Sequence, residues 1–240
     1  MVTIDLSHGG TDETRWLPWL DTETWPAIEP AAAGACGPLV VAPHPDDEIL
    51  GAAGLLSLAG RADVVAVTDG EASHPHLEGP ARVELARRRR AESVEALSCL
   101  GLGASVAVHR LGQPDGAVDE PALFADLTGR LWPGRWCVAS WRGDGHPDHE
   151  AVGRAAAAAC AAVGARLLEY PVWMWHWAAP GDPRVPWSRA HRLTLPRETV
   201  AAKAAAIRRF RSQIADDAGP AVLPAYVLAR FRRPYEVYFA

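Results

Sequence analysis

The chain has 240 residues, of which 49% are hydrophobic and 22% charged, and its formal net charge is −5 at pH 7. This length fits one large domain with a substantial core, and the composition is typical of a soluble globular protein. The mildly acidic balance gives no footprint for binding nucleic acid or an anionic membrane.

The first 35 residues are irregular and carry Trp16, Trp19 and Trp25 among acids and prolines. We expect them to form an arm, residues 1–35, that packs through its tryptophans on a domain spanning residues 36–240. The segment lacks the basic and apolar regions of a signal peptide, and no run of about 18 apolar residues could span a membrane. The four cysteines are scattered and predict no disulfide framework, so a cytoplasmic protein is expected.

From Pro38 onward, short apolar runs alternate with helical patterns. The predicted strands are 38–43, 62–70, 104–111, 135–141 and 165–170, and the predicted helices are 48–60, 81–100, 121–131 and 148–163. This alternation predicts a single-domain α/β fold, with a Rossmann-like, mostly parallel sheet and helices on both faces. After Tyr170 the pattern is less regular, with strands predicted near 191–195 and 236–239 and one helix over 198–214.

Two polar clusters stand where a predicted strand gives way to a helix. HPDDE occupies 44–48, after the first strand, and GDGHPDHE occupies 143–150, after the fourth. Because an open parallel sheet binds ligands outside the carboxyl ends of its strands, the two clusters should meet at one rim. Imidazoles and carboxylates are the ligands of a catalytic zinc, and a divalent cation would neutralise acids that otherwise repel one another. A further carboxylate and histidine could serve as base and as proton donor or oxyanion partner.

These residues resemble a known family. PHPDDE at 43–48 and HPDH at 146–149 are similar to the motifs of the PIG-L/LmbE-like zinc-dependent N-deacetylases. TDGE at 68–71, the helix segment 89–101 and PDG at 114–116 extend the resemblance. It covers about Leu39 to Arg166 well and the C-terminal third poorly.

The resemblance implies a ligand set and a reaction. His44, Asp47 and His149 would bind Zn²⁺, Asp46 would be the general base, and His146 would polarise the tetrahedral intermediate or protonate the leaving amine. The implied reaction is attack of zinc-bound water on an amide carbonyl, which removes an N-acetyl or other N-acyl group from a glucosamine-containing or related amino sugar. Two histidines and a carboxylate also accept Fe²⁺ or Co²⁺.

Other residues have open interpretations. Arg89, Glu71 and Asp115 match family positions near the sugar, although Arg89 is also one of four consecutive arginines on a helix. Glu48 is either a partner that orients a metal ligand or an acid at a helix start. Asp144 either holds a histidine tautomer or is a turn residue.

The segment VWMWHWA at 172–178 places Trp173, Trp175 and Trp177 on one side if it is extended. These tryptophans would form a binding wall for a sugar or acyl chain, or pack against the core or a subunit partner.

Three alternatives remain for the function. The same fold could cleave an amide in a thiol conjugate or in an acylated glycopeptide or natural product. It could also be a non-catalytic sugar- or metal-binding module, although Asp46 and His146 would then have no role. The partner expected is a small-molecule amino-sugar conjugate, with no nucleic acid and no membrane span, and a homo-oligomer is left open.

Overall fold

The computed structural model describes residues 9–215 and 220–240. The centre of the molecule is a seven-stranded sheet in the order β3-β2-β1-β4-β5-β7-β6. Its strands are β1 Leu39–Ala42, β2 Ala62–Thr68, β3 Val106–Gln113, β4 Trp136–Ser140, β5 Arg166–Tyr170, β6 Ala190–Thr194 and β7 Tyr235–Phe239. Strands β1 to β5 are parallel, whereas β7 is antiparallel to both β5 and β6. The predicted α/β fold with a mostly parallel sheet is confirmed.

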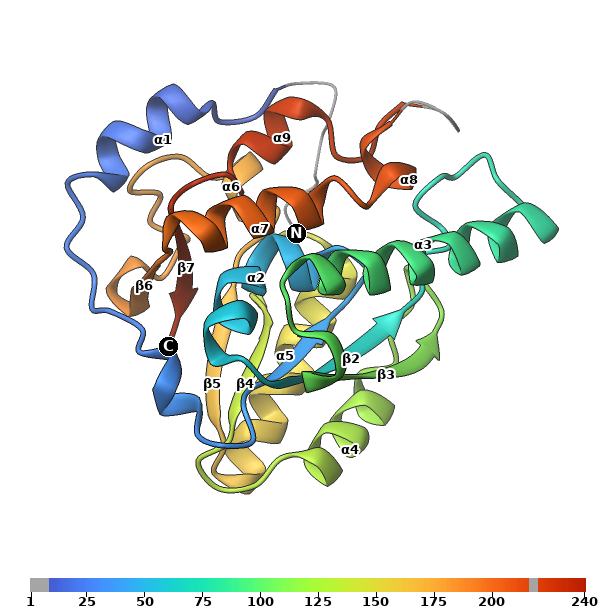
Figure 1. Cartoon of the computed structure of the whole chain (residues 1–240), viewed down its shortest axis with the longest axis horizontal. Coiled ribbons are helices and arrows are strands. Elements are labelled where there is room, and N and C mark those ends of the chain that lie inside the picture. Colours follow the sequence, from blue (N-terminus) through green and yellow to red (C-terminus); the bar gives the residue numbers. More distant parts are fainter. Residues whose placement is uncertain (1–8, 216–219) are drawn as a thin grey trace.

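Helices cover both faces of this sheet (Figure 1). One face carries α2 (Asp47–Ala59), α3 (Pro80–Cys99) and α7 (Arg197–Ile207), and the other carries α4 (Glu120–Arg130) and α5 (Pro147–Val163). The strands separate these two layers because successive side chains point to opposite faces. In β1, for example, Val40 packs in the layer with α2, whereas Leu39 and Val41 pack in the layer with α5.

The shorter elements join or flank these layers. They are the helices α1 Glu13–Leu20, α6 Met174–Trp177, α8 Arg211–Ile214 and α9 Ala225–Ala229, and the 3₁₀ turns η1 Pro30–Ala33, η2 Gly103–Ser105 and η3 Trp187–Arg189.

Strand β1 is the point at which the order of the sheet reverses. It pairs with β2 on one side and with β4 on the other, and the chain continues outward to β3 in one direction and to β5 in the other. The loops after β1 and β4 therefore diverge and leave a crevice between them, where such sheets bind ligands. HPDDE follows β1 and GDGHPDHE follows β4, so the topology brings the two clusters to the same crevice.

The N-terminal segment is more regular than expected. The first eight residues of the predicted arm lie outside the described part, and the rest contains the helix α1 and the turn η1. Asp12 caps α1, since its side chain accepts the Thr14 N–H at 2.8 Å. Trp16, in α1, is completely buried against Trp175, with 5.0 Å between the ring centroids. The prediction of an irregular segment was wrong because one capped, Trp-anchored helix forms within it.

One prediction in the C-terminal third was also wrong, and the condition attached to another segment is not met. The helix expected over 198–214 is divided into α7 and α8, with Phe210 buried at the break in a non-helical conformation (φ −77°, ψ 58°). The Trp-rich segment is not extended, because α6 is a helical turn. Its rings therefore diverge: Trp175 packs on Trp16, and Trp177 stacks on Trp141 with 6.3 Å between ring centroids.

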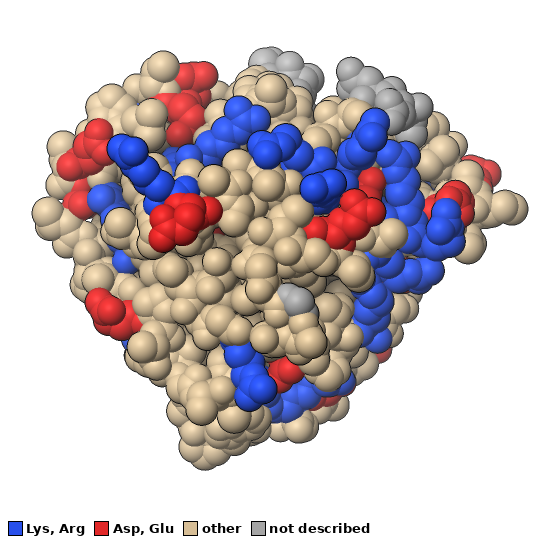
Figure 2. Space-filling model, viewed as in Figure 1, with Lys and Arg blue, Asp and Glu red and all other residues tan. Residues whose placement is uncertain are grey.

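The surface mixes both charges. Figure 2 shows a band of basic side chains along the edge where Figure 1 places α3, with acidic side chains beside it. Arginines of α3 form ion pairs there, such as Arg87 with Glu84 and Arg90 with Asp69. In the described ranges, 9–215 and 220–240, every helix is too short or too polar to cross a membrane.

Candidate functional site

The junction between β1 and α2 holds a strained residue. Asp46 has φ +134°, and it is the only non-glycine residue with positive φ among those described. Glu48 supports this conformation, since its Oε2 accepts the Asp46 N–H at 3.0 Å and its Oε1 accepts the Ser93 hydroxyl at 2.7 Å. Backbone strain of this kind persists only where the surroundings enforce it, and it concentrates at functional sites. Glu48 thus contacts the backbone of Asp46 as well as standing in the first turn of α2.

Asp47 lies between two histidines. Its Oδ2 is 3.2 Å from His44 Nδ1 and 3.2 Å from His149 Nε2, and it accepts the His44 N–H at 3.0 Å. Two ligand atoms on one tetrahedral zinc ion are separated by about 3.3 Å, given metal–ligand bonds of about 2.0 to 2.2 Å. Each of the two distances from Asp47 Oδ2 to a ring nitrogen is therefore compatible with a pair of ligands on one metal.

The outer nitrogens of both rings meet carboxylates. His44 Nε2 lies 3.1 Å from Asp148 Oδ2 and 3.1 Å from Asp115 Oδ1, and His149 Nδ1 lies 2.8 Å from Asp144 Oδ2. A carboxylate on the outer nitrogen fixes the tautomer of a metal-binding histidine and turns its other nitrogen toward the metal. Here the nitrogens opposite those carboxylates are the two that face Asp47.

The environment of these rings fits a divalent cation. His149 Nε2 is buried and has no hydrogen-bond partner among the described residues. Burial lowers the pKa of His149, but Asp47 and Asp144 outweigh it and raise that pKa to about 9. Burial likewise opposes protonation of His44, yet Asp115, Asp148 and Asp47 raise its pKa well above the ordinary value. The carboxylates stabilise the protonated, positively charged rings. A bound divalent cation would supply the same compensating positive charge.

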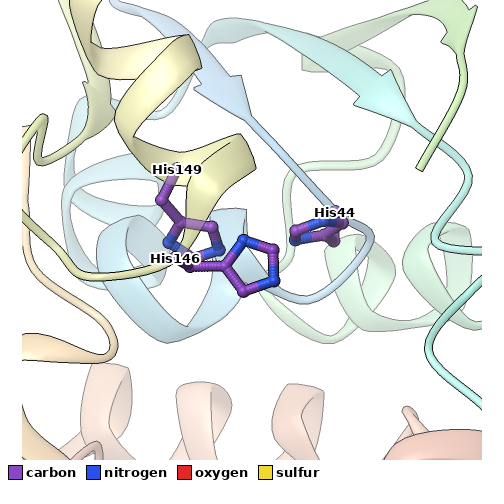
Figure 3. A group of neighbouring side chains, drawn as sticks. All are labelled: His44, His146 and His149. Atoms are coloured by element: carbon purple, nitrogen blue, oxygen red, sulfur yellow. The ribbon is translucent and has the colours of Figure 1, made fainter. Parts of the chain in front are cut away.

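A third imidazole adjoins the pair. Figure 3 shows His146 and His149 at the start of α5 beside His44 from the loop after β1. These three residues can offer nitrogens that all lie within 4.8 Å of one another, and so can His44, Asp115 and Asp148 with their ligand atoms. His146 caps α5, since its Nδ1 accepts the Asp148 N–H at 3.2 Å. Burial, with His149 and His44 nearby, lowers the pKa of His146 to about 3.

Arg89 holds the side chain of Asp46. Its Nη2 donates to Asp46 Oδ2 at 3.0 Å and to the Pro45 carbonyl at 2.8 Å, and its Nη1 donates to the Gly70 carbonyl at 2.8 Å. A Cβ at Gly70, where φ is +67°, would lie 2.0 Å from Arg89 Nη1, so the guanidinium requires glycine there. Burial raises the pKa of Asp46 to about 7, although Arg89 opposes the shift.

These groups open on a cavity of about 340 Å³. Its lining includes all five of the predicted metal and catalytic residues, His44, Asp46, Asp47, His146 and His149. Arg89 and Asp115 also line it. The rest of the wall is largely apolar and is formed by Leu50, Val172, Trp173, Val222 and Leu223, together with Ala72, Ser73, Gly116 and Gln213. A cavity of this size suits a small ligand such as one sugar unit.

The predicted substrate residues differ in their access to this cavity. Arg89 and Asp115 line it, and both are also hydrogen-bonded within the protein. Glu71 is not among the lining residues; its Oε1 accepts the Asp115 N–H at 3.0 Å and so holds the loop that presents Asp115.

Sequence reasoning missed some contacts around the histidines. The contact of Asp148 with His44 was not foreseen, although Asp148 stands inside the HPDH motif. Asp144 had two interpretations, and the structure supports the first: it is completely buried and accepts from His149. The signal for both was an acid one to five residues before the candidate ligand His149.

Comparisons with known proteins add independent findings. Residues 39–160, just over half of the chain, match the family described as PIG-L, GlcNAc-PI de-N-acetylase. A comparison with curated proteins gives no significant match.

Solved structures with this fold are also similar. A conserved protein of Thermus thermophilus is 29% identical with a TM-score of 0.59, covering 84% of this chain and 93% of that one. The N,N′-diacetylchitobiose deacetylase of Pyrococcus horikoshii is 23% identical with a TM-score of 0.58, covering 75% and 71%. The 4-carboxy-2-hydroxymuconate hydratase of Pseudomonas putida is 21% identical with a TM-score of 0.53, covering 73% and 79%. The deacetylase and the hydratase show likeness of fold alone.

Proposed function

Since the chain belongs to the PIG-L family, we propose that it is a zinc-dependent hydrolase that removes an N-acetyl or other N-acyl group from a glucosamine-containing or related amino sugar. Family membership supports a deacetylase. The observation that carries the metal-dependent form is the position of Asp47 Oδ2, 3.2 Å from one nitrogen each of His44 and His149.

The proposed ligands are His44, Asp47 and His149. A zinc ion held by them would act as a Lewis acid and lower the pKa of a water molecule to near neutrality. The carboxylates on the outer ring nitrogens would keep the inner nitrogens unprotonated and aimed inward, as binding requires.

Asp46 is the proposed general base. Its carboxylate opens on the cavity next to Asp47, and Arg89 and the strained backbone fix its direction. From there it takes a proton from the attacking water and returns it to the departing nitrogen. The C–N bond breaks, and the products are a carboxylic acid and an amine.

His146 is the proposed partner of the developing oxyanion. Because its Nδ1 accepts the Asp148 N–H, the proton of the neutral ring resides on Nε2. That N–H can donate to the amide oxygen as its negative charge grows in the transition state. A module that only binds sugar or metal needs neither this donor nor a base, which supports catalysis.

The first test measures metal content and amine release together. We expect about one zinc per chain by elemental analysis and release of amine from N-acetylglucosamine conjugates. His149→Ala should lose both, whereas Asp46→Asn should keep the metal and release amine on the order of 10²- to 10⁴-fold more slowly. His191→Ala, a histidine of β6 outside the cavity, is the matched control and should lose neither.

Two further variants test whether Asp47 or His146 is the metal ligand. Asp47→Ala should abolish metal binding, and His146→Ala should keep it while slowing release. The reverse result would assign His146 as a ligand. Metal-loaded protein that releases no amine would point to another amide or to a hydratase reaction, and wild-type protein that cannot bind metal would refute the zinc mechanism.

A further inference from the structure

Gln213 brings a buried amide to the cavity from the C-terminal third of the chain. It lies in α8 and is completely buried, yet it lines the same cavity as His44, Asp47 and His149. Figure 1 shows α8 beside α3, and the two are joined through Glu92 of α3. No step of the proposed hydrolysis involves a residue of α8.

The direction of the Gln213 amide is set by its neighbours. The Ser212 hydroxyl donates to Glu92 Oε2 at 2.5 Å, so the only proton of that hydroxyl is committed. The Ser212 oxygen can then only accept, and it accepts from Gln213 Nε2 at 3.0 Å. The Ser212 N–H donates to Glu92 Oε1 at 2.9 Å and holds this arrangement in place. The nitrogen of the Gln213 amide therefore faces Ser212, and Oε1 is the amide atom that points away from Ser212.

Gln213 Oε1 has no protein partner. It is buried and makes no hydrogen bond to any residue in the described part of the chain. Buried side-chain oxygens are nearly always hydrogen-bonded, and one left unpaired carries a desolvation penalty. Because Gln213 belongs to the cavity wall, its unpaired oxygen is suited to accept from a ligand that packs against this residue.

The surroundings indicate the class of donor. Val222, Leu223 and Trp173 line the same cavity, and an amide oxygen carries no formal charge. A neutral donor flanked by C–H groups matches this combination, which is the chemistry of a sugar ring with its hydroxyls. We infer that Gln213 Oε1 accepts a hydrogen bond from one ring hydroxyl of the substrate and is a specificity-determining residue. The identity of that ligand as an amino sugar rests on the proposed function.

The test measures binding and does not depend on turnover. Methyl β-glucosaminide and its 3-, 4- and 6-deoxy analogues are titrated calorimetrically into the zinc-loaded full chain. For wild type, we expect one deoxy analogue to bind about tenfold more weakly than the parent, as expected for loss of one neutral hydrogen bond. In Gln213→Leu, which keeps the size of the side chain but removes the acceptor, the parent and that analogue should bind equally.

Each outcome has a defined meaning. Equal binding of all four ligands to wild type, no measurable binding, or a preference that persists in Gln213→Leu would overturn the inference. The wild-type series tests it without any variant, and Gln213→Met replaces Gln213→Leu if the latter does not fold. Amine release from the N-acetylated parent is assayed in parallel. Release without hydroxyl discrimination refutes only the role of Gln213, whereas discrimination without release refutes only the deacetylase.

Discussion

Asp144 illustrates how one side chain sets the chemistry of another. Its carboxylate accepts the N–H groups of Val172, Trp173 and Met174, each at 2.9 Å, and also contacts His149 Nδ1. The loop after β5 and the ring of His149 are therefore fixed by the same group. A carboxylate can do this because both of its oxygens only accept.

Asp144→Asn should lower the affinity for zinc. The new amide keeps one accepting oxygen, and when its NH₂ group takes the place of Oδ2 it faces both the Trp173 N–H and His149 Nδ1. His149 would then shift its proton to Nε2, the nitrogen that faces Asp47. We expect zinc affinity to fall about 10- to 100-fold, measured by competition with a chromophoric chelator. Asp119→Asn, the same change at the exposed cap of α4, is the control; unchanged affinity in Asp144→Asn would contradict the role given to Asp144.

Arg89 offers a second prediction at this scale. Arg89→Lys removes the fork that reaches Asp46, Pro45 and Gly70 together, because an ammonium group cannot match that planar geometry. We expect kcat for amine release to fall on the order of tenfold or more while metal content stays at the wild-type level. Gly70→Ala should reproduce this result by displacing the guanidinium. Loss of metal in either variant would show that the contact supports the ligands rather than the base.

At the scale of elements, α2 connects the site to strand β7. Its Gly54 and Leu55 N–H groups donate to Glu236 of β7, at 2.8 and 3.1 Å. Lys203 of α7 donates to the Leu50 carbonyl at 2.8 Å and to Glu236 at 2.6 Å. The helix that begins with Asp47 is thus held by a buried ion pair, whose charges are satisfied by hydrogen bonds.

Close packing of α2 predicts a marked difference between two glycines. A Cβ at Gly51 would lie 2.1 Å from the Tyr170 ring, whereas a Cβ at Gly129 in α4 would meet nothing within 4 Å. Gly51→Ala should lower the free energy of unfolding by about 1 to 3 kcal/mol through overpacking. Gly129→Ala should raise it by up to about 1 kcal/mol, since alanine favours helix. Urea denaturation measures both, and equal effects would refute the packing argument.

The elements also show how far sequence alone could reach. The strands and helices up to Tyr170 have continuous apolar runs or glycine ends, so their types and approximate positions were predictable, as was the crevice shared by the two motifs. The break at Phe210 and the turn at Trp173–Trp177 were not, because tertiary burial of these side chains overrides local period. Contacts such as Glu92 with Ser212 join segments 120 residues apart and leave no local signal.

At the scale of the whole molecule, the N-terminal segment packs against the C-terminal third of the chain. The indole of Trp16 donates to the Trp175 carbonyl at 3.0 Å, and Arg233 forms an ion pair with Glu13. Trp175 is two residues from Trp173, which lines the cavity. The arm is therefore part of the structure that supports the wall of the site.

Trp16→Ala should destabilise the entire protein. Removal of a completely buried indole typically costs about 3 to 5 kcal/mol of unfolding free energy. Leu17→Ala, at a neighbouring position that is 41% exposed, should change it by about 0.5 kcal/mol or less. Both are measured by denaturant unfolding. A main transition unchanged in Trp16→Ala would mean that the arm is only loosely attached.

Lys203 is the single lysine of the chain, and only 3% of its surface is exposed. An amine-acylating reagent can reach its side chain only when α7 separates from α2 and β7. The rate at which Lys203 becomes acylated, followed by mass spectrometry, would therefore report how often α7 separates from α2 and β7. Each molecule can be acylated at Lys203 only once, and no label has to be introduced. Addition of zinc should slow the labelling if the metal holds the start of α2 in place.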